Sequence, residues 1–419
     1  MVRKKKALQN NLPLYILFMI IVFHIGYSYY YKYSILINKN TLITLFVWLI
    51  AIYCSYTYKN NFILLFPIVL LVINEMLYYF FNMDVFDGPS RTKMFYDMTT
   101  LKFTLGDNGN SNLTEGLYLK NLNDTNSVMT IEEAKQLDPK VANTNKYKKM
   151  FMELNIPTYE YENIKILDIG CGNGDFIKYC KTIGIQVTGL SISEQQILDI
   201  KKNGYDAHLG SYRELHKQFI HQFDVITFWG SLEHITNSYP CSKSGIEKAD
   251  KMLETIFTHC KHYYKPTSPY KYLFTTTLHI NRSVCNTMDA YIIERAYSGW
   301  YFMDEPGKRV GEKIEKYGFK QTKKNNDDYT YHYYLASKVD PSHFGLPANI
   351  DLLKILIGIS AVFINPQILA MLVYTITGEW MWQFDGKSHY GEACLDCKYD
   401  NNRKTRPTTL VWTFNKLVN

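Results

Sequence analysis

One stretch, from Ile166 to Phe176, constrains the fold of this chain more than any other. Apolar residues run directly into a Gly-x-Gly-x-Gly turn at residues 170–174, and a helical pattern continues to about Lys181. Glycines are needed where a backbone turns with positive φ or lies against a ligand. A helix N-terminus also offers unpaired N–H groups to a polar ligand. The stretch therefore predicts a buried strand, a tight loop and a helix start.

Strand and helix patterns alternate after this stretch. A second strand follows one helix, as a βαβ unit requires. We expect strands at Lys165–Ile169, Ile185–Leu190, Asp206–Leu209, Phe223–Phe228, Lys271–Thr277, Gly318–Lys323 and Tyr329–Ala336, helices such as Glu194–Asn203 and Ile246–His262, and a final strand at Arg406–Phe414. The alternation predicts an α/β fold with a seven-stranded, mostly parallel, doubly wound sheet. Ligands of such sheets bind at the carboxyl ends of the strands.

The glycine loop indicates a nucleotide-type cofactor. Asp168 stands at the end of the first strand, just before the loop, which reads Gly-Cys-Gly-Asn-Gly-Asp. This pattern resembles the S-adenosylmethionine (SAM) loop of class I methyltransferases, whose fold is Rossmann-like. The rival is a nicotinamide fingerprint, which needs an acid about 20 residues further on. Here the second strand ends in Gly189-Leu190-Ser191, with no acid at its tip. We therefore expect SAM, and a glycine turn without a ligand is the remaining alternative.

Four further motifs share a more specific resemblance. Phe95–Met98 is similar to a His-Tyr-Asp-Leu entry motif, and Met129–Ala134 to a Met-Thr-Leu-x-Glu-Ala helix. Gly189–Gln196 is similar to Gly-x-Thr-Leu-Ser-x-x-Gln, and Gly230–Ile235 to Gly-Met-Phe-Glu-His-Val. All four belong to the cyclopropane-fatty-acyl-phospholipid synthases and mycolic acid cyclopropane synthases. The resemblance implies transfer of a methyl or methylene group from SAM to an unsaturated acyl chain of a membrane lipid.

The two resemblances imply a set of cofactor contacts. Thr114 stands where the family's Ser touches SAM, Tyr212 is placed to stack near the adenine, and Ser193 fits a helix N-cap better than a ligand contact. The implied SAM-binding residues are Thr114, Asp168, Gly170, Cys171, Gly172, Gly174, Ser191, Gln196 and Tyr212.

The resemblance also implies catalytic residues. The family arranges a Cys, a Glu, a His and a Tyr around a bicarbonate that removes a proton. Glu233 matches the Glu and Tyr329 the Tyr, whereas Glu115 replaces the Cys and Phe274 replaces the His. Two of the four ligands differ, which weakens the case for bound bicarbonate. His234, beside Glu233, is interpreted as structural.

Glu115 offers a substitute for bicarbonate. Methyl transfer to an alkene makes a carbocation, and a proton must then leave. We hypothesise that the Glu115 carboxylate takes the bicarbonate position and acts as the base. Burial near Glu233 should raise the pKa of both carboxyl groups. The simpler interpretation of Glu233 is an acid favoured at a helix start by the macrodipole.

The N-terminal region predicts a membrane anchor. Leu12–Tyr31, Thr41–Tyr58 and Phe62–Phe81 are apolar runs of roughly 18–21 residues, near the length that spans a bilayer. The basic cluster Arg3–Lys6 favours a cytosolic N-terminus. We expect a multi-pass membrane protein whose third run lies partly in the interface, with the catalytic domain facing the cytosol. Buried soluble helices are the alternative.

Composition limits the other partners. The net charge of +7 is diffuse, which argues against nucleic acid. Eight scattered cysteines indicate reduced thiols, and the lone pair Cys394 and Cys397 lacks the further ligands of a structural zinc site, so we expect no metal. A homo-oligomer is possible.

The expected domains are a membrane anchor at 1–84, an entry segment at 85–160, a methyltransferase domain at 161–340, and apolar helices and a tail at 341–419.

Two other functions stay open. Plant alkaloid N-methyltransferases share the Phe-Glu-His signature, so the chain is alternatively a small-molecule amine or phosphobase N-methyltransferase. Loss of the family's Cys and His also fits a catalytically inactive, membrane-tethered SAM-binding protein.

Overall fold

The fold was analysed in a computed structural model, which describes residues 92, 93, 96, 114–235, 243–281, 302–323, 328–339 and 408–418. The chain divides into two units, Met1–Asn82 and Met83–Asn419, and every described residue belongs to the second. The three apolar N-terminal runs and the Cys394–Cys397 pair lie outside the described residues. Within the described ranges, no helix is both long and apolar enough to cross a membrane.

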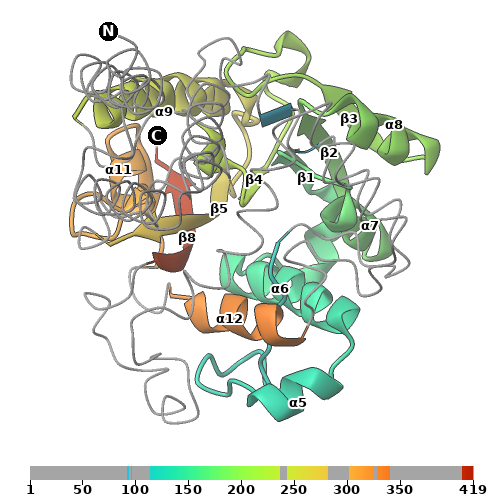
Figure 1. Ribbon diagram of the computed structural model, residues 1–419. Helices are drawn as coiled ribbons and strands as arrows, with labels where there is room; N and C mark the ends of the chain where they lie inside the picture. The colour runs from blue at the N-terminus through green and yellow to red at the C-terminus, as the bar shows by residue number, and fades with distance from the viewer. Residues whose placement is uncertain are drawn as a thin grey trace, which may run out of the picture. The chain divides into compact units, whose positions relative to one another are not determined.

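A single twisted sheet organises the described residues (Figure 1). Its strand order is β3-β2-β1-β4-β5-β8-β7, and β6 pairs with β5 beside this path. The strands are β1 (Lys165–Ile169), β2 (Gln186–Ser191), β3 (Asp206–Leu209), β4 (Val225–Trp229), β5 (Tyr272–Ile280), β6 (Phe302–Met303), β7 (Phe319–Gln321) and β8 (Thr408–Leu417). Strands β1 to β5 pair in parallel. The predicted α/β class is confirmed. The sheet of the described residues has eight strands, not the predicted seven, and it is mixed because β8 runs antiparallel to both of its neighbours.

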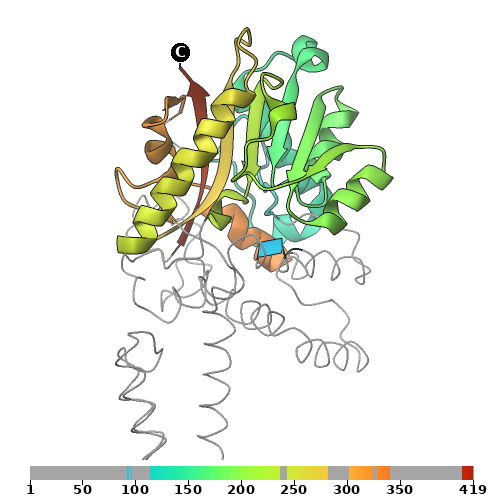
Figure 2. The same cartoon turned by 90° about the horizontal axis from the view of Figure 1, so that it is seen from above.

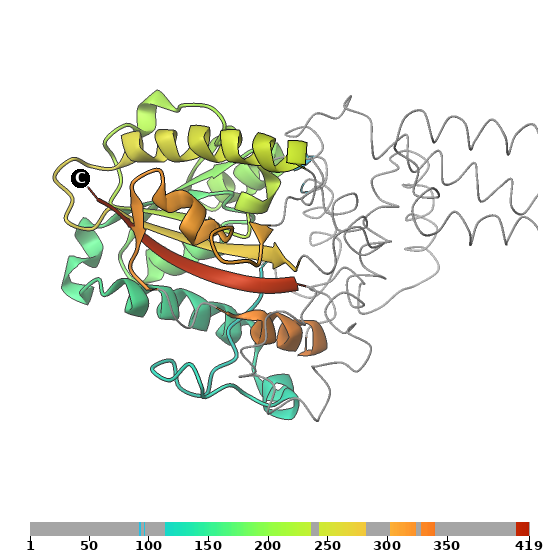
Figure 3. The same ribbon diagram turned by 90° about the vertical axis from the view of Figure 1, so that its left-hand side faces the viewer.

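Strand β8 is the second strand from one edge of the sheet. It runs antiparallel between β5 and β7 and pairs with β5 over nine residue pairs, from Tyr272–Lys416 to Ile280–Thr408. Figures 2 and 3 show this long red strand lying against β5. The predicted final strand is confirmed, and it belongs to the same sheet as the glycine-loop strand although the sequence places it far away.

One predicted strand is wrong. Residues Tyr329–Ala336 lie mostly in the helix α12 (Thr330–Val339), not in a strand. The Asp328 carboxylate accepts hydrogen bonds from the Thr330 backbone N–H at 3.0 Å and from the Thr330 hydroxyl at 2.6 Å. These local bonds favour a helix start over an extended chain. The predicted strand is therefore absent, and β8 pairs directly with β5 and β7.

Helices cover both faces of the sheet, as a doubly wound fold requires (Figure 3). On one face lie α6 (Pro139–Leu154), α7 (Asp175–Thr182) and α8 (Glu194–Lys202). On the other lie α9 (Lys243–Tyr263) and α11 (Val310–Glu315). Each face has its own apolar cluster, and burial of these side chains is the main source of stability.

Local signals in the sequence set the helix starts. Ser193 caps α8 by accepting a hydrogen bond from the Gln196 N–H, as predicted. Thr130 and Glu133 form a capping box that opens α5 (Ile131–Gln136), and this places a helix at the Met129–Ala134 motif. In α6 the N-cap is Asp138, followed directly by a proline, which suits the first helical position. Two of these helices, α5 and α6, belong to the entry segment; α5 packs on α12, and α6 packs on α7.

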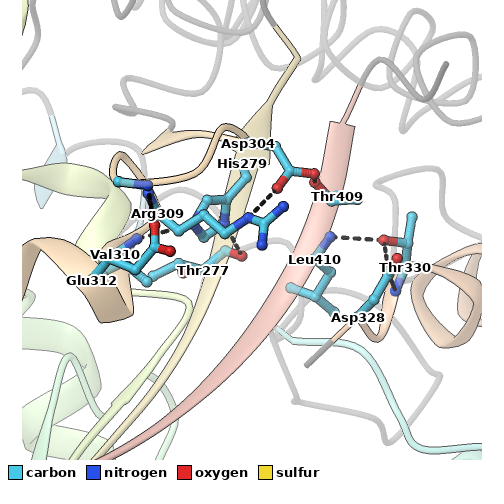
Figure 4. Close-up of polar contacts among 11 residues, drawn as sticks. Thr277, His279, Asp304, Arg309, Val310, Glu312, Asp328, Thr330, Thr409 and Leu410 are labelled. Atoms are coloured by element: carbon cyan, nitrogen blue, oxygen red, sulfur yellow. Dashed lines mark hydrogen bonds and ion pairs between the residues drawn. The ribbon is translucent and has the colours of Figure 1, made fainter. Parts of the chain in front are cut away.

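Side-chain hydrogen bonds hold β8 and the neighbouring loops in place (Figure 4). Asp304 receives one hydrogen bond from Arg309 Nε at 2.7 Å and another from the Thr409 hydroxyl at 2.6 Å. The Leu410 N–H donates to the Thr330 hydroxyl at 3.0 Å. Buried His279 accepts from the Val310 N–H at 3.2 Å, which fixes the start of α11. These bonds anchor the strand that carries Trp412 into the site.

Candidate active site

A cavity lies at the carboxyl ends of the parallel strands, where a doubly wound sheet binds its ligands. Its wall comes from the loops that follow β1, β2, β3 and β4, together with part of the entry segment. Among the predicted SAM-binding residues, those that line it are Thr114, Gly170, Cys171, Gly172, Ser191, Gln196 and Tyr212. The fold therefore brings seven of the nine predicted positions to one cavity from sequence positions almost 100 residues apart.

The glycine loop adopts the backbone that its sequence predicts. Gly170 and Gly172 have φ values of 77° and 54°, a region that residues with a Cβ atom rarely occupy. A side chain at Gly170 would also collide with Ser231, whose hydroxyl donates to the Ile169 carbonyl at 2.5 Å. The loop after β1 and the loop after β4 are thus in close contact, and glycine is required at this point.

The end of β2 presents a hydroxyl and an amide in place of an acid. The Ser191 hydroxyl donates to Gln196 Oε1 at 2.8 Å and accepts from the Ser193 N–H at 3.1 Å. Ser191 and Gln196 both line the cavity, whereas Ser193 caps the helix. This pair is suited to hydrogen-bond neutral hydroxyl groups, such as those of a ribose.

Asp168 and Gly174 lie just behind the cavity wall. Asp168 is buried, accepts a hydrogen bond from the Thr227 hydroxyl at 2.8 Å, and has a pKa raised to about 7 by burial. A Cβ at Gly174 would lie 2.8 Å from Ile200 Cγ1, so this glycine allows α7 to approach α8. Cofactor contact by these two residues stays a prediction.

His234, interpreted from sequence as structural, also lines the cavity. Its Nε2 lies 2.5 Å from the Tyr96 hydroxyl, and the two rings meet edge to face. Arg213 Nη2 donates to the carbonyl oxygens of His234 and Ile235, each at 3.1 Å. The Tyr96 hydroxyl therefore connects the entry segment to the loop after β4.

Glu115 and Glu233 are both buried close to each other behind this wall. Glu233 lies in the short helix η5 (Leu232–His234), and its Oε1 accepts from the Leu278 N–H at 2.9 Å. Within the described part of the chain, Glu115 Oε1 and Glu233 Oε2 have no hydrogen-bond partner. Burial raises the pKa of Glu115, and burial, with a smaller effect of Glu115, raises that of Glu233 to about 8. The expected increase in both pKa values is confirmed.

Aromatic side chains form a wall beside the two carboxyl groups. Trp229 packs against Phe274 with ring centroids 4.6 Å apart, and Trp412 stacks on Tyr329 at 4.0 Å and 14°. In the sheet register, Trp229 and Trp412 are the neighbours of Thr276 on either side. Phe274 thus extends an apolar surface. Tyr329, the residue directly before α12, joins this wall, and its catalytic role stays a prediction.

Lys146 is a buried cation that sequence reasoning missed. It lies on α6 with no exposed surface, and its Nζ lies 5.1 Å from the centroid of the Tyr147 ring and 5.5 Å from that of Trp229. Burial lowers its pKa to about 8, while the charge of Glu115 opposes this decrease. The local sequence Asn-Lys-Tyr-Lys-Lys reads as a solvated helix face, so only the tertiary structure distinguishes Lys146 from its neighbours.

The raised pKa of Glu233 gives a testable pH dependence. The folded state holds this proton up to about pH 8, whereas an ordinary glutamic acid loses it near pH 4.5. The folded state therefore binds more protons across this window, and its stability falls as the pH rises. Glu233→Gln keeps the neutral shape, so we expect it to match the wild type near pH 5 and to raise the Tm at pH 8 by roughly 5 °C or more. Differential scanning fluorimetry at both pH values measures this, and an equal Tm difference at the two values would contradict it.

Comparison with known proteins defines the class. Residues 142–264 match the family model of a methyltransferase domain. This range includes the glycine loop, the Ser191–Gln196 pair and Glu233. Together with the sheet order, the match shows that the chain contains a SAM-dependent methyltransferase domain with a class I, Rossmann-like α/β fold.

One curated relative is similar to a short part of this chain. The ubiquinone biosynthesis O-methyltransferase of Aromatoleum aromaticum is 34% identical over 77 residues, which are 17% of this chain. The chain spans about a third of the length of this curated relative (33%).

Two solved structures are similar to this chain over about three quarters of its length. The geranyl diphosphate C-methyltransferase of Streptomyces coelicolor has a TM-score of 0.44 at 9% identity, covering 77% of this chain and 98% of the other. The cyclopropane synthase MmaA2 of Mycobacterium tuberculosis has a TM-score of 0.44 at 15% identity, covering 76% and 97%. Because both TM-scores are below 0.5, the class rests on the sheet and on residues 142–264.

Proposed function

We propose that this protein transfers a methyl or methylene group from SAM to an unsaturated acyl chain of a membrane lipid. The observation that carries the proposal is the pair Glu115 and Glu233, buried together beside an aromatic wall and directly behind the cofactor cavity. Thr114 lines that cavity, and Glu115 is the next residue. An apolar acceptor on which positive charge develops is the kind of substrate that this combination suits.

The reaction needs one acceptor for a proton. The SAM methyl carbon bonds to one alkene carbon while the C–S bond breaks, and its electron pair stays on sulfur to give S-adenosylhomocysteine. The other alkene carbon becomes a cation. A proton then passes to the Glu115 carboxylate, and the electrons of the broken C–H bond close a cyclopropane ring or form a new double bond. The faces of Trp229 and Phe274 stabilise the cation, and Glu233 adds to this once its carboxyl group has ionised.

Two further parts of the proposal concern location. The three apolar runs of the N-terminal 84 residues support anchoring in a bilayer with the catalytic domain on the cytosolic side. An anchored enzyme suits an acceptor that stays in the membrane.

Lipid analysis of cells that express the protein tests this function. The cells are supplied with methionine labelled in its methyl group, and a Glu115→Gln variant is the matched control. We expect label in acyl chains that were unsaturated, only with the wild-type protein. Label on soluble amines instead would favour the N-methyltransferase alternative. Binding of SAM without label in any lipid or amine would favour an inactive SAM-binding protein.

A further inference from the structure

Lys146 joins the entry segment to the cofactor cavity. Its ammonium donates to the Thr114 carbonyl oxygen at 3.4 Å and lies within hydrogen-bond distance of the Thr114 hydroxyl. Thr114 lines the cavity, and so do Tyr147 and Trp229, whose rings flank the ammonium. Lys146 is thus a positive charge directly behind the residues that a cofactor touches.

The direction of the Lys146–Thr114 hydrogen bond has a chemical consequence. An ammonium can only donate, so the Thr114 hydroxyl oxygen accepts from Lys146. The hydroxyl hydrogen of Thr114 therefore points away from the ammonium, and toward a group in the cavity this hydroxyl can act as a donor. A hydroxyl that accepts from a cation is also a better donor, because each hydrogen bond polarises the next. Thr114 is therefore prepared to donate to an anionic group in the cavity.

The charges around Lys146 come from three elements. Glu115 belongs to the entry segment, Asp168 to β1 and Asp175 to α7, and each acts on the Lys146 charge. Asp175 lines the cavity and pairs with Lys178 at 3.1 Å, whereas burial favours the neutral forms of Glu115 and Asp168. The wall of the cavity therefore carries a carboxylate, and a cation lies directly behind that wall. The amino-acid end of SAM is a zwitterion, which needs both.

We propose that Lys146 is a positioning residue for the carboxylate of SAM, acting through the Thr114 hydroxyl. This assignment places the amino-acid end of the cofactor between Thr114 and the start of α7. It rests on the part of the proposed function in which SAM binds in this cavity, and it does not depend on the lipid acceptor.

Matched ligands test the assignment. We expect Lys146→Met to weaken the binding of SAM and of S-adenosylhomocysteine by about tenfold or more, because both carry the carboxylate. Decarboxylated SAM keeps the sulfonium and the amine, so its Kd should change less than about twofold. Isothermal titration of the full chain measures all three. An equal loss for the three ligands, no loss, or a gain for SAM alone would overturn the proposal.

Two further substitutions keep the test decisive. Thr114→Val removes the hydroxyl but not the fold, and it should reproduce the ligand pattern of Lys146→Met, whereas Thr114→Ser should behave as the wild type. This pair decides the matter even where Lys146→Met fails to fold. Lys178→Met, which removes a partly exposed cation near the same cavity, should leave the ratio between SAM and decarboxylated SAM unchanged. Failure of wild-type protein to bind SAM would instead refute the cofactor itself.

Discussion

Glu115→Gln is expected to lower turnover about 100- to 10,000-fold while SAM binding stays within about twofold of the wild type, the range typical of a lost general base. The amide has the same shape as the carboxylic acid but cannot take up the proton that leaves the cation. Because burial raises the pKa of Glu115, wild-type activity should rise with pH as this carboxyl ionises. Initial rates over a pH series, together with the Kd of SAM, measure both effects.

A matched control shows whether the lost turnover depends on the position of Glu115 or follows from the removal of any carboxylate. Glu132→Gln removes an exposed carboxylate from α5 and should change neither turnover nor SAM binding. Full activity of Glu115→Gln would show that another group takes the proton. A parallel loss of SAM affinity would mean that Glu115 supports the cofactor rather than the reaction.

Trp412→Ala should produce the largest loss of stability. The side chain is 1% exposed, stacks on Tyr329, and meets Trp229 and Phe274 edge to face. Replacing a buried tryptophan by alanine costs about 3–5 kcal/mol, because apolar contacts are lost and a cavity remains. For a domain of this size, we expect the Tm to fall by roughly 6–20 °C.

Two control substitutions give the scale for this decrease in Tm. Trp412→Phe keeps most of the apolar contact and should lose less than half as much Tm. Leu215→Ala alters a side chain that is 41% exposed and should shift the Tm by only about 1 °C. A change of the same size for Trp412→Ala and Leu215→Ala would contradict the buried placement of β8 between β5 and β7.

The elements close to the glycine loop could be predicted from sequence because their signals are local. Strand β1 and the caps of α5 and α8 follow from apolar runs, glycines and capping residues that neighbour one another. The cavity residues followed from motifs at the strand ends. For these elements, pattern and structure agree because short-range rules and the sheet favour the same conformation.

The other features of the fold and the site depend on contacts between residues that lie far apart in the sequence. Residues 330–339 contain several tyrosines, which favour strands, but the Asp328 cap favours a helix. Lys146 looks like one of several surface lysines, and only the packing of α6 on the sheet buries it. Trp412 reaches the site because β8 returns across the sheet to pair with β5. No local pattern carries such information.

The most direct measurement follows the methyl group itself. Purified protein is mixed with SAM carrying a trideuterated methyl group and with vesicles of dioleoyl phosphatidylcholine, with fully saturated phosphatidylcholine as the control. Mass spectrometry of the released acyl chains should find the labelled carbon in the unsaturated chains alone, after loss of one deuteron or of one chain proton. Label in neither lipid from a protein that binds SAM, or equal label in both, would contradict carbocation chemistry on an acyl double bond.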